Sequence, residues 1–101
     1  MLGGRFRDPC ALVKLEVTYI PLSLLRRRPD DHWTILDIRR AQEIAANFDI
    51  NAFRPLRVIS DGEDGYFVWD GRHRLLAIQN EKFFGDGEQM VPCYISLAAY
   101  P

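Results

Sequence analysis

The order of two patterns of apolar residues along the chain is the feature that most limits what it can fold into. A strand with one buried face alternates apolar and polar residues, whereas a helix repeats its apolar residues every three or four positions. The strand pattern, or an apolar run of strand length, occurs at residues 15–20, 56–59, 66–69 and 91–95. The turn residues 61–65 join the second and third of these segments, which predicts a hairpin.

Helical spacing occurs between these strands. Apolar residues recur at that spacing over residues 38–48, and Thr34 with Asp37 three residues later is typical of a helix start. We therefore predict one helix over residues 34–47 and a second over residues 72–80. The order strand, helix, strand, strand, helix, strand predicts an α/β (α+β) fold, a small mixed sheet with two main helices.

The remaining segments are expected to be connections. Pro21 ends the first strand, residues 22–25 are expected to form one short helical turn, and residues 26–31 a charged loop. The 101 residues, of which 48% are hydrophobic, are enough for one core. We expect a single domain over residues 14–101, preceded by a partly ordered leader at residues 1–13.

The lengths of the apolar runs and the spacing of the cysteines bear on the cellular location of the protein. No apolar run approaches the roughly 20 residues of a membrane helix, and the N-terminus lacks the apolar region of a signal peptide. We therefore expect a soluble, cytoplasmic protein with no membrane contact. Cys10 and Cys93 are far apart and form no Cys-x-x-Cys pair, so they indicate neither a metal site nor a disulfide framework. Cys93 lies in an apolar stretch and is expected to be buried.

Charge is unevenly distributed along the chain. The formal net charge is −1, whereas a dedicated DNA-binding domain carries a basic excess. Residues 1–28 hold six basic and two acidic residues, a net of +4, which leaves −5 for the remainder. Any contact with nucleic acid would therefore be local, and its candidates are Arg26, Arg27 and Arg28. The alternative is a solvated loop whose charge Asp30 and Asp31 balance.

The segment from Asp70 to Arg74 carries the strongest functional pattern. A strand runs through Asp70-Gly71 directly into a helix, whose first backbone N–H groups point outward with the positive end of the helix dipole. Gly71 allows a sharp turn, and Arg72 and Arg74 add planar cations that suit phosphate. This combination predicts a phosphate site. The alternative is structural: Asp70 caps the helix, and the two arginines are solvated.

Two residues of this segment are candidates for catalysis. His73 is a candidate general base, metal ligand or phosphate donor, because histidines titrate near neutral pH. No second histidine or cysteine lies at ligand spacing from it. Asp70 is the candidate for holding Mg²⁺ or for orienting His73.

Residues 69–77 resemble the motif of the ParB/sulfiredoxin superfamily, in particular its phage and actinobacterial members with Asp-Gly-x-His-Arg. ParB proteins have Gly-Glu-Arg-Arg-x-Arg-Ala there, and Gly71, Arg74 and Ala77 fall on its glycine, its fourth-position arginine and its alanine. Sulfiredoxins have Gly-Cys-His-Arg, which Gly71, His73 and Arg74 match, with Arg72 in place of the cysteine. The likeness covers residues 15–95.

The resemblance implies a ligand and a process. Family members hold nucleotide phosphates at this segment, CTP in partition proteins and ATP in sulfiredoxin. It therefore implies that Gly71, Arg72, His73 and Arg74 bind the phosphates of CTP or ATP with Mg²⁺, in a DNA-linked process of phage or mobile-element origin. Without a cysteine at position 72, the sulfiredoxin reaction is not expected. The chain ends near its last strand, so we do not expect a complete partition protein.

Two other functions stay open beside this one. The first is a metal-dependent ParB-like nuclease, with Asp70 as metal ligand and Asp70 and His73 as catalytic residues. Only one carboxylate lies near His73 in the sequence, whereas nuclease sites gather several. The second is a catalytically inert module that binds protein or DNA. Whether the chain hydrolyses a nucleotide, and whether it forms a homo-oligomer or joins a larger complex, is not determined by the sequence.

Overall fold

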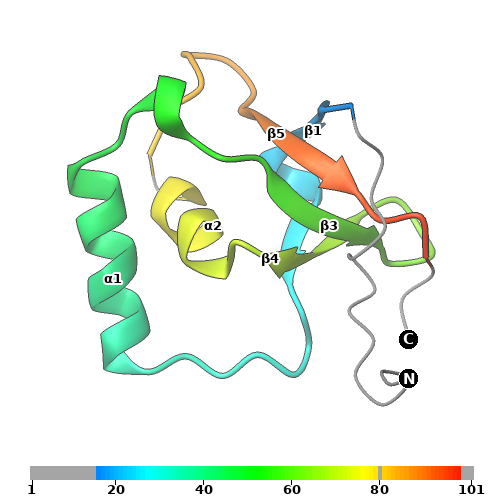
Figure 1. Cartoon of the computed structure of the whole chain (residues 1–101), viewed down its shortest axis with the longest axis horizontal. Coiled ribbons are helices and arrows are strands. Elements are labelled where there is room, and N and C mark those ends of the chain that lie inside the picture. Colours follow the sequence, from blue (N-terminus) through cyan, green and yellow to red (C-terminus); the bar gives the residue numbers. More distant parts are fainter. Residues whose placement is uncertain (1–15, 80, 99–101) are drawn as a thin grey trace, which may run out of the picture.

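The computed structural model of the chain describes residues 16–79 and 81–98 (Figure 1). The leader expected at residues 1–13 lies outside the described residues, and so do Cys10 and the start of the first expected strand. Every expected strand and helix is present, and one strand is added. In chain order the elements are β1 (Thr18–Pro21), η1 (Leu22–Leu24), β2 (Leu25–Arg27), α1 (Ile35–Ala46), η2 (Ile50–Ala52), β3 (Leu56–Ser60), β4 (Tyr66–Asp70), α2 (Arg72–Gln79) and β5 (Met90–Ile95).

The strands form one mixed five-stranded sheet in the order β1-β5-β3-β4-β2. β1 pairs with β5 and β3 with β4 in antiparallel fashion, and β3 pairs with β5 and β2 with β4 in parallel. The β3–β4 hairpin is the one that the turn at residues 61–65 predicts. The chain is therefore a mixed α/β protein with two main helices, as predicted.

The prediction of a charged loop over residues 26–31 is wrong at its start, where β2 forms an edge strand. Leu25 is 3% exposed and pairs with Tyr66, so one buried leucine anchors the strand. The charged side chains that follow are compatible with an edge strand, because one side of it faces solvent. Arg26 pairs with Asp61 and lies over the ring of Phe67. The short helical turn predicted before it is present as η1.

The helices form two layers on the sheet, with α2 between the sheet and α1 (Figure 1). α2 buries Leu75, Ala77 and Ile78. The core beneath it consists of fully or nearly fully buried aliphatic residues together with Cys93, namely Ile20, Leu25, Leu56, Val58, Val68, Leu75, Ile78 and Val91. Cys93 is 0% exposed, so the predicted burial of this cysteine is confirmed, and burial raises the pKa of its thiol to about 12.

Aromatic side chains close the core at the end of α1. Phe48 stacks on Phe83 with 4.0 Å between ring centroids. Phe53 and Phe84 pack tilted or edge-on against Phe48 and against each other. The Phe83-Phe84 segment thereby covers the core although the chain around it forms no helix or strand. No helix in the described part of the chain has the length and apolarity needed to cross a membrane.

Candidate functional site

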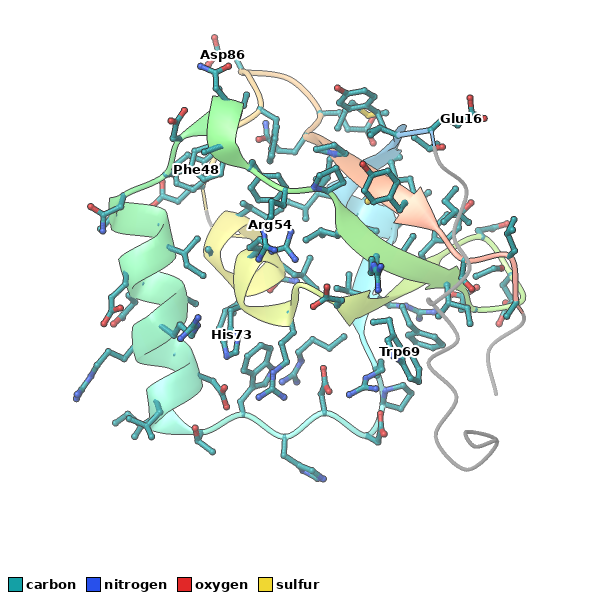
Figure 2. All side chains as sticks on the ribbon, in the orientation of Figure 1. Glu16, Phe48, Arg54, Trp69, His73 and Asp86 are labelled. Carbon is teal, nitrogen blue, oxygen red and sulfur yellow. The ribbon has the colours of Figure 1, made fainter. Side chains whose placement is uncertain are left out.

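Parallel pairing of β2 with β4 brings the basic segment beside the start of α2. Arg27 lies opposite Val68 in the register of the two strands. The next residue, Arg28, has its guanidinium carbon 4.4 Å from the ring centroid of Trp69. Trp69 is followed by Asp70 and the turn into α2. Two segments more than 40 residues apart in sequence therefore meet at one end of the sheet, where Trp69 is labelled in Figure 2.

Gly71 turns the chain from β4 into α2. Its φ of +111° is a conformation that side-chain-bearing residues rarely adopt. A Cβ at this position would lie 2.6 Å from Leu56 Cδ2 and 2.9 Å from Arg74 Nη2. Backbone conformation and close packing both require glycine here, whether or not a ligand binds.

Arg72 and His73, on the first turn of α2, share one carboxylate oxygen. Asp37 Oδ1 lies 2.9 Å from Arg72 Nη2 and 2.7 Å from His73 Nε2. Asp37 belongs to the first turn of α1, and its backbone and side chain form a capping box with Thr34. The sequence pattern Thr34-x-x-Asp37 predicted this helix start. Nothing in the sequence indicated that Asp37 also contacts the motif 35 residues away.

The environment of Asp37 keeps it ionised. The hydrogen bond with His73 is the largest cause that lowers the pKa of this carboxyl well below its usual value of 3.8, followed by the backbone N–H of Thr34. Burial acts in the opposite direction and is outweighed. Asp37 is therefore an anion that neutralises part of the charge of α2's first turn.

The lowered pKa of Asp37 predicts a pH dependence of stability. A carboxyl whose folded-state pKa is depressed stabilises the fold above its unfolded-state pKa and loses that contribution as pH falls through the folded-state value. Asp37 therefore stabilises the protein above about pH 4, and the contribution disappears in stronger acid. We expect the melting temperature of Asp37→Asn to fall less than that of the wild type between about pH 6 and pH 2. Asp64→Asn is the control, because this carboxylate is exposed in the turn between β3 and β4, and an equal effect of both variants would contradict the assignment.

Trp33 contacts three of the charged or polar groups at this end of the molecule. The guanidinium carbons of Arg27 and Arg72 lie 4.9 Å and 5.1 Å from its ring centroid. The ring of His73 approaches it edge-on at 6.0 Å. Cation–π contacts of this kind hold a guanidinium in a fixed plane. We name Arg27, Arg28, Arg72, Trp33 and Trp69 the arginine–tryptophan cluster.

Acidic residues compensate two of the three arginines of this cluster. Arg28 Nη2 lies 3.1 Å from Asp31 Oδ1, whose side chain is only 2% exposed. The Asp31 oxygen is also 3.7 Å from Arg72 Nη1. The prediction that acidic residues balance the basic segment is thus confirmed for Arg28. Arg27 is exposed and has no acidic partner among residues 16–79 and 81–98.

Arg74 lies apart from this cluster. Its guanidinium donates hydrogen bonds to the backbone carbonyls of Arg54 and Pro55, and its side chain is 14% exposed. Burial lowers its pKa. Arg74 therefore fastens α2 to the segment that leads into β3, and the structure separates it from Arg72.

Asp70 is the exposed residue of the predicted segment Asp70 to Arg74. Its side chain is 63% exposed, and Arg74 Nη2, at 4.0 Å, is its charged neighbour. Within the described ranges it forms no hydrogen bond to the start of α2, so the capping interpretation is wrong. His73 is held by Asp37 and not by Asp70. The same part of the chain contains no group of three or more His, Cys, Asp or Glu side chains placed to hold a metal ion.

No protein-family model matches the chain, and no curated protein matches it. The resemblance of residues 69–77 to the ParB/sulfiredoxin motif therefore stays an expectation. The structure shows which side chains surround residues 69–77. Arg72 and His73 face Asp37 and Trp33. Arg27 at the end of β2 and Arg28 directly after it lie beside them, and Gly71 and Arg74 have packing roles.

Proposed function

We propose that this protein binds a nucleoside triphosphate, CTP or ATP with Mg²⁺, and that the phosphates lie against Arg72, His73 and Arg27 at the start of α2. The process it serves would be linked to DNA and cytoplasmic, as the resemblance to the ParB/sulfiredoxin superfamily implies. The observation that carries the proposal is the meeting of three guanidinium groups, from the end of β2, the residue after it and α2, at one helix N-terminus.

The geometry of Arg72 supports a role in phosphate binding. One face of its guanidinium lies over Trp33, so part of the conformational entropy of this side chain is already lost before binding. Nε and Nη1 form no hydrogen bond within the described part of the chain and are available to phosphate oxygens. The free N–H groups of the first helical turn add donors beside it.

Arg27 supplies the charge of the cluster that no acidic residue in the described part of the chain compensates. It is exposed, lies on the other arginine-bearing element, and contacts the same tryptophan as Arg72. The long side chain of Arg27 can reach a second phosphate of a polyphosphate chain. Arg72 alone cannot neutralise the charge of such a chain. The pair therefore favours a triphosphate over a monophosphate.

Calorimetric titration with CTP, ATP and ADP in the presence of Mg²⁺ tests the proposal. We expect Arg72→Ala to weaken binding about tenfold or more, because it removes charge-assisted hydrogen bonds. Arg27→Ala should weaken it about threefold, as expected for an exposed cation. Arg39→Ala on the exposed face of α1 is the control and should leave affinity unchanged.

The variant Arg74→Ala is unsuitable for this purpose, because Arg74 holds backbone carbonyls and its loss would disturb the fold. Flat titrations with all three nucleotides up to millimolar concentration would contradict the proposal and favour the interaction module. Incubation of the same protein with supercoiled plasmid and Mg²⁺ or Mn²⁺ tests the nuclease alternative.

A further inference from the structure

The two oxygens of the Asp37 carboxylate have separate tasks. Oδ2 accepts from the backbone N–H of Thr34 at 2.9 Å and from its hydroxyl at 3.0 Å, which caps α1. Oδ1 faces the other helix, 2.9 Å from Arg72 Nη2 and 2.7 Å from His73 Nε2. One oxygen of the carboxylate therefore accepts hydrogen bonds from its own helix start, and the other contacts the first turn of α2.

The position of Oδ1 is the one that a phosphate oxygen would take. It is an anionic oxygen at hydrogen-bond distance from two donors on the first turn of a helix, and phosphate sites at helix N-termini have this arrangement. The other carboxylate near Arg72 is Asp31, but its oxygen is 3.7 Å from Nη1, beyond hydrogen-bond length. Asp37 is therefore the anion that a ligand phosphate meets first at Arg72 and His73.

Displacing Oδ1 would leave the capping box of α1 in place, because Thr34 binds Oδ2. The link between the first turns of α1 and α2 would be released, while both helices stay formed. Such a displacement requires no unfolding of either helix, only a small movement of one side chain.

We infer that Asp37 is an internal competitor of the ligand, an anion of the protein itself that occupies Arg72 and His73 until a phosphate displaces it. This inference rests on the proposed function, because it concerns the same donors. Its consequence is that Asp37 sets the affinity of the site and makes it weaker than the arginines alone would allow.

Titration of the wild type and of Asp37→Asn with inorganic triphosphate tests this inference, since the probe carries the charge without the base. Asparagine can still accept from Thr34, so α1 keeps its cap. Removing one negative charge beside the bound phosphate is expected to tighten binding about three- to tenfold. Glu43→Gln is the matched control: it changes the net charge equally at an exposed position of the same helix and should leave affinity within about twofold of the wild type.

The outcomes separate the inference from the proposed function. Triphosphate binding by the wild type that Asp37→Asn leaves unchanged or weakens overturns the inference alone. Flat titrations of both proteins overturn the proposed function and the inference with it. If Asp37→Asn does not fold, carbon NMR of the Asp37 carboxyl in the wild type decides. We expect saturating triphosphate to raise the pKa of Asp37 toward its usual 3.8, because the carboxylate loses its hydrogen bond with His73, and an unchanged value overturns the inference.

Discussion

Gly71→Ala is expected to lower the free energy of unfolding by about 3 kcal/mol. A non-glycine residue at φ +111° is strained, and the added Cβ would lie 2.6 Å from Leu56 Cδ2 in the fully buried core. The neighbouring Arg74 Nη2, at 2.9 Å, belongs to a guanidinium held by backbone carbonyls and cannot move freely either. Urea denaturation followed by far-UV circular dichroism measures the loss.

Alanine variants at two other glycines separate the backbone strain from the steric contact with Leu56. Gly62 has a φ of +88° with nothing within 4 Å of an added Cβ, so Gly62→Ala carries only the backbone strain, about 1–2 kcal/mol. Gly87 has neither a positive φ nor a neighbour within 4 Å, so Gly87→Ala should lie within about 0.5 kcal/mol of the wild type. If Gly71→Ala is no worse than Gly62→Ala, the close approach to Leu56 is contradicted.

Leu75→Ala is expected to destabilise the fold by a similar amount, about 3 kcal/mol. Leu75 is 0% exposed and belongs to the core cluster beneath α2, so its loss removes buried apolar surface and leaves a cavity. The measurement is the same denaturation experiment. The expected loss is a large fraction of the stability of a small domain.

Leu36→Ala is the matched control for Leu75, because it makes the same chemical change in a helix. Leu36 is 67% exposed on the first turn of α1, so this variant should stay within about 0.5 kcal/mol of the wild type. Equal losses for both variants would show that α2 does not bury the face that carries Leu75.

The packing of Gly71 and Arg74 also decides how the motif is interpreted. Gly71 and Arg74 are the two motif positions that match both ParB proteins and sulfiredoxins, yet both have a packing reason that needs no ligand. Loss of binding in variants at these positions would therefore report on folding as much as on phosphate. Arg72 and Arg27 are the informative positions, because the core does not depend on them.

Local patterns allowed several elements to be predicted from the sequence. The capping pair Thr34 and Asp37 with the apolar spacing after it determined α1, since both act within one or two helical turns. Asp70-Gly71 determined the turn from β4 into α2, where the structure has a glycine at positive φ. The apolar runs determined four of the five strands, because the pleat of a strand is a local property.

The tertiary structure alone determined the fifth strand and the neighbours of the motif. β2 has three residues and one buried side chain, too short a pattern to distinguish a strand from a charged loop until β4 pairs with it. The contact of Asp37 with Arg72 and His73 joins residues about 35 positions apart, and it exists because α1 packs on α2. The spacing of residue types along the chain predicts local secondary structure. Which charged residues meet across the fold depends on the strand order of the sheet and on helix packing. The sequence therefore located the candidate site on α2, and the fold supplied the carboxylate and the arginines around it.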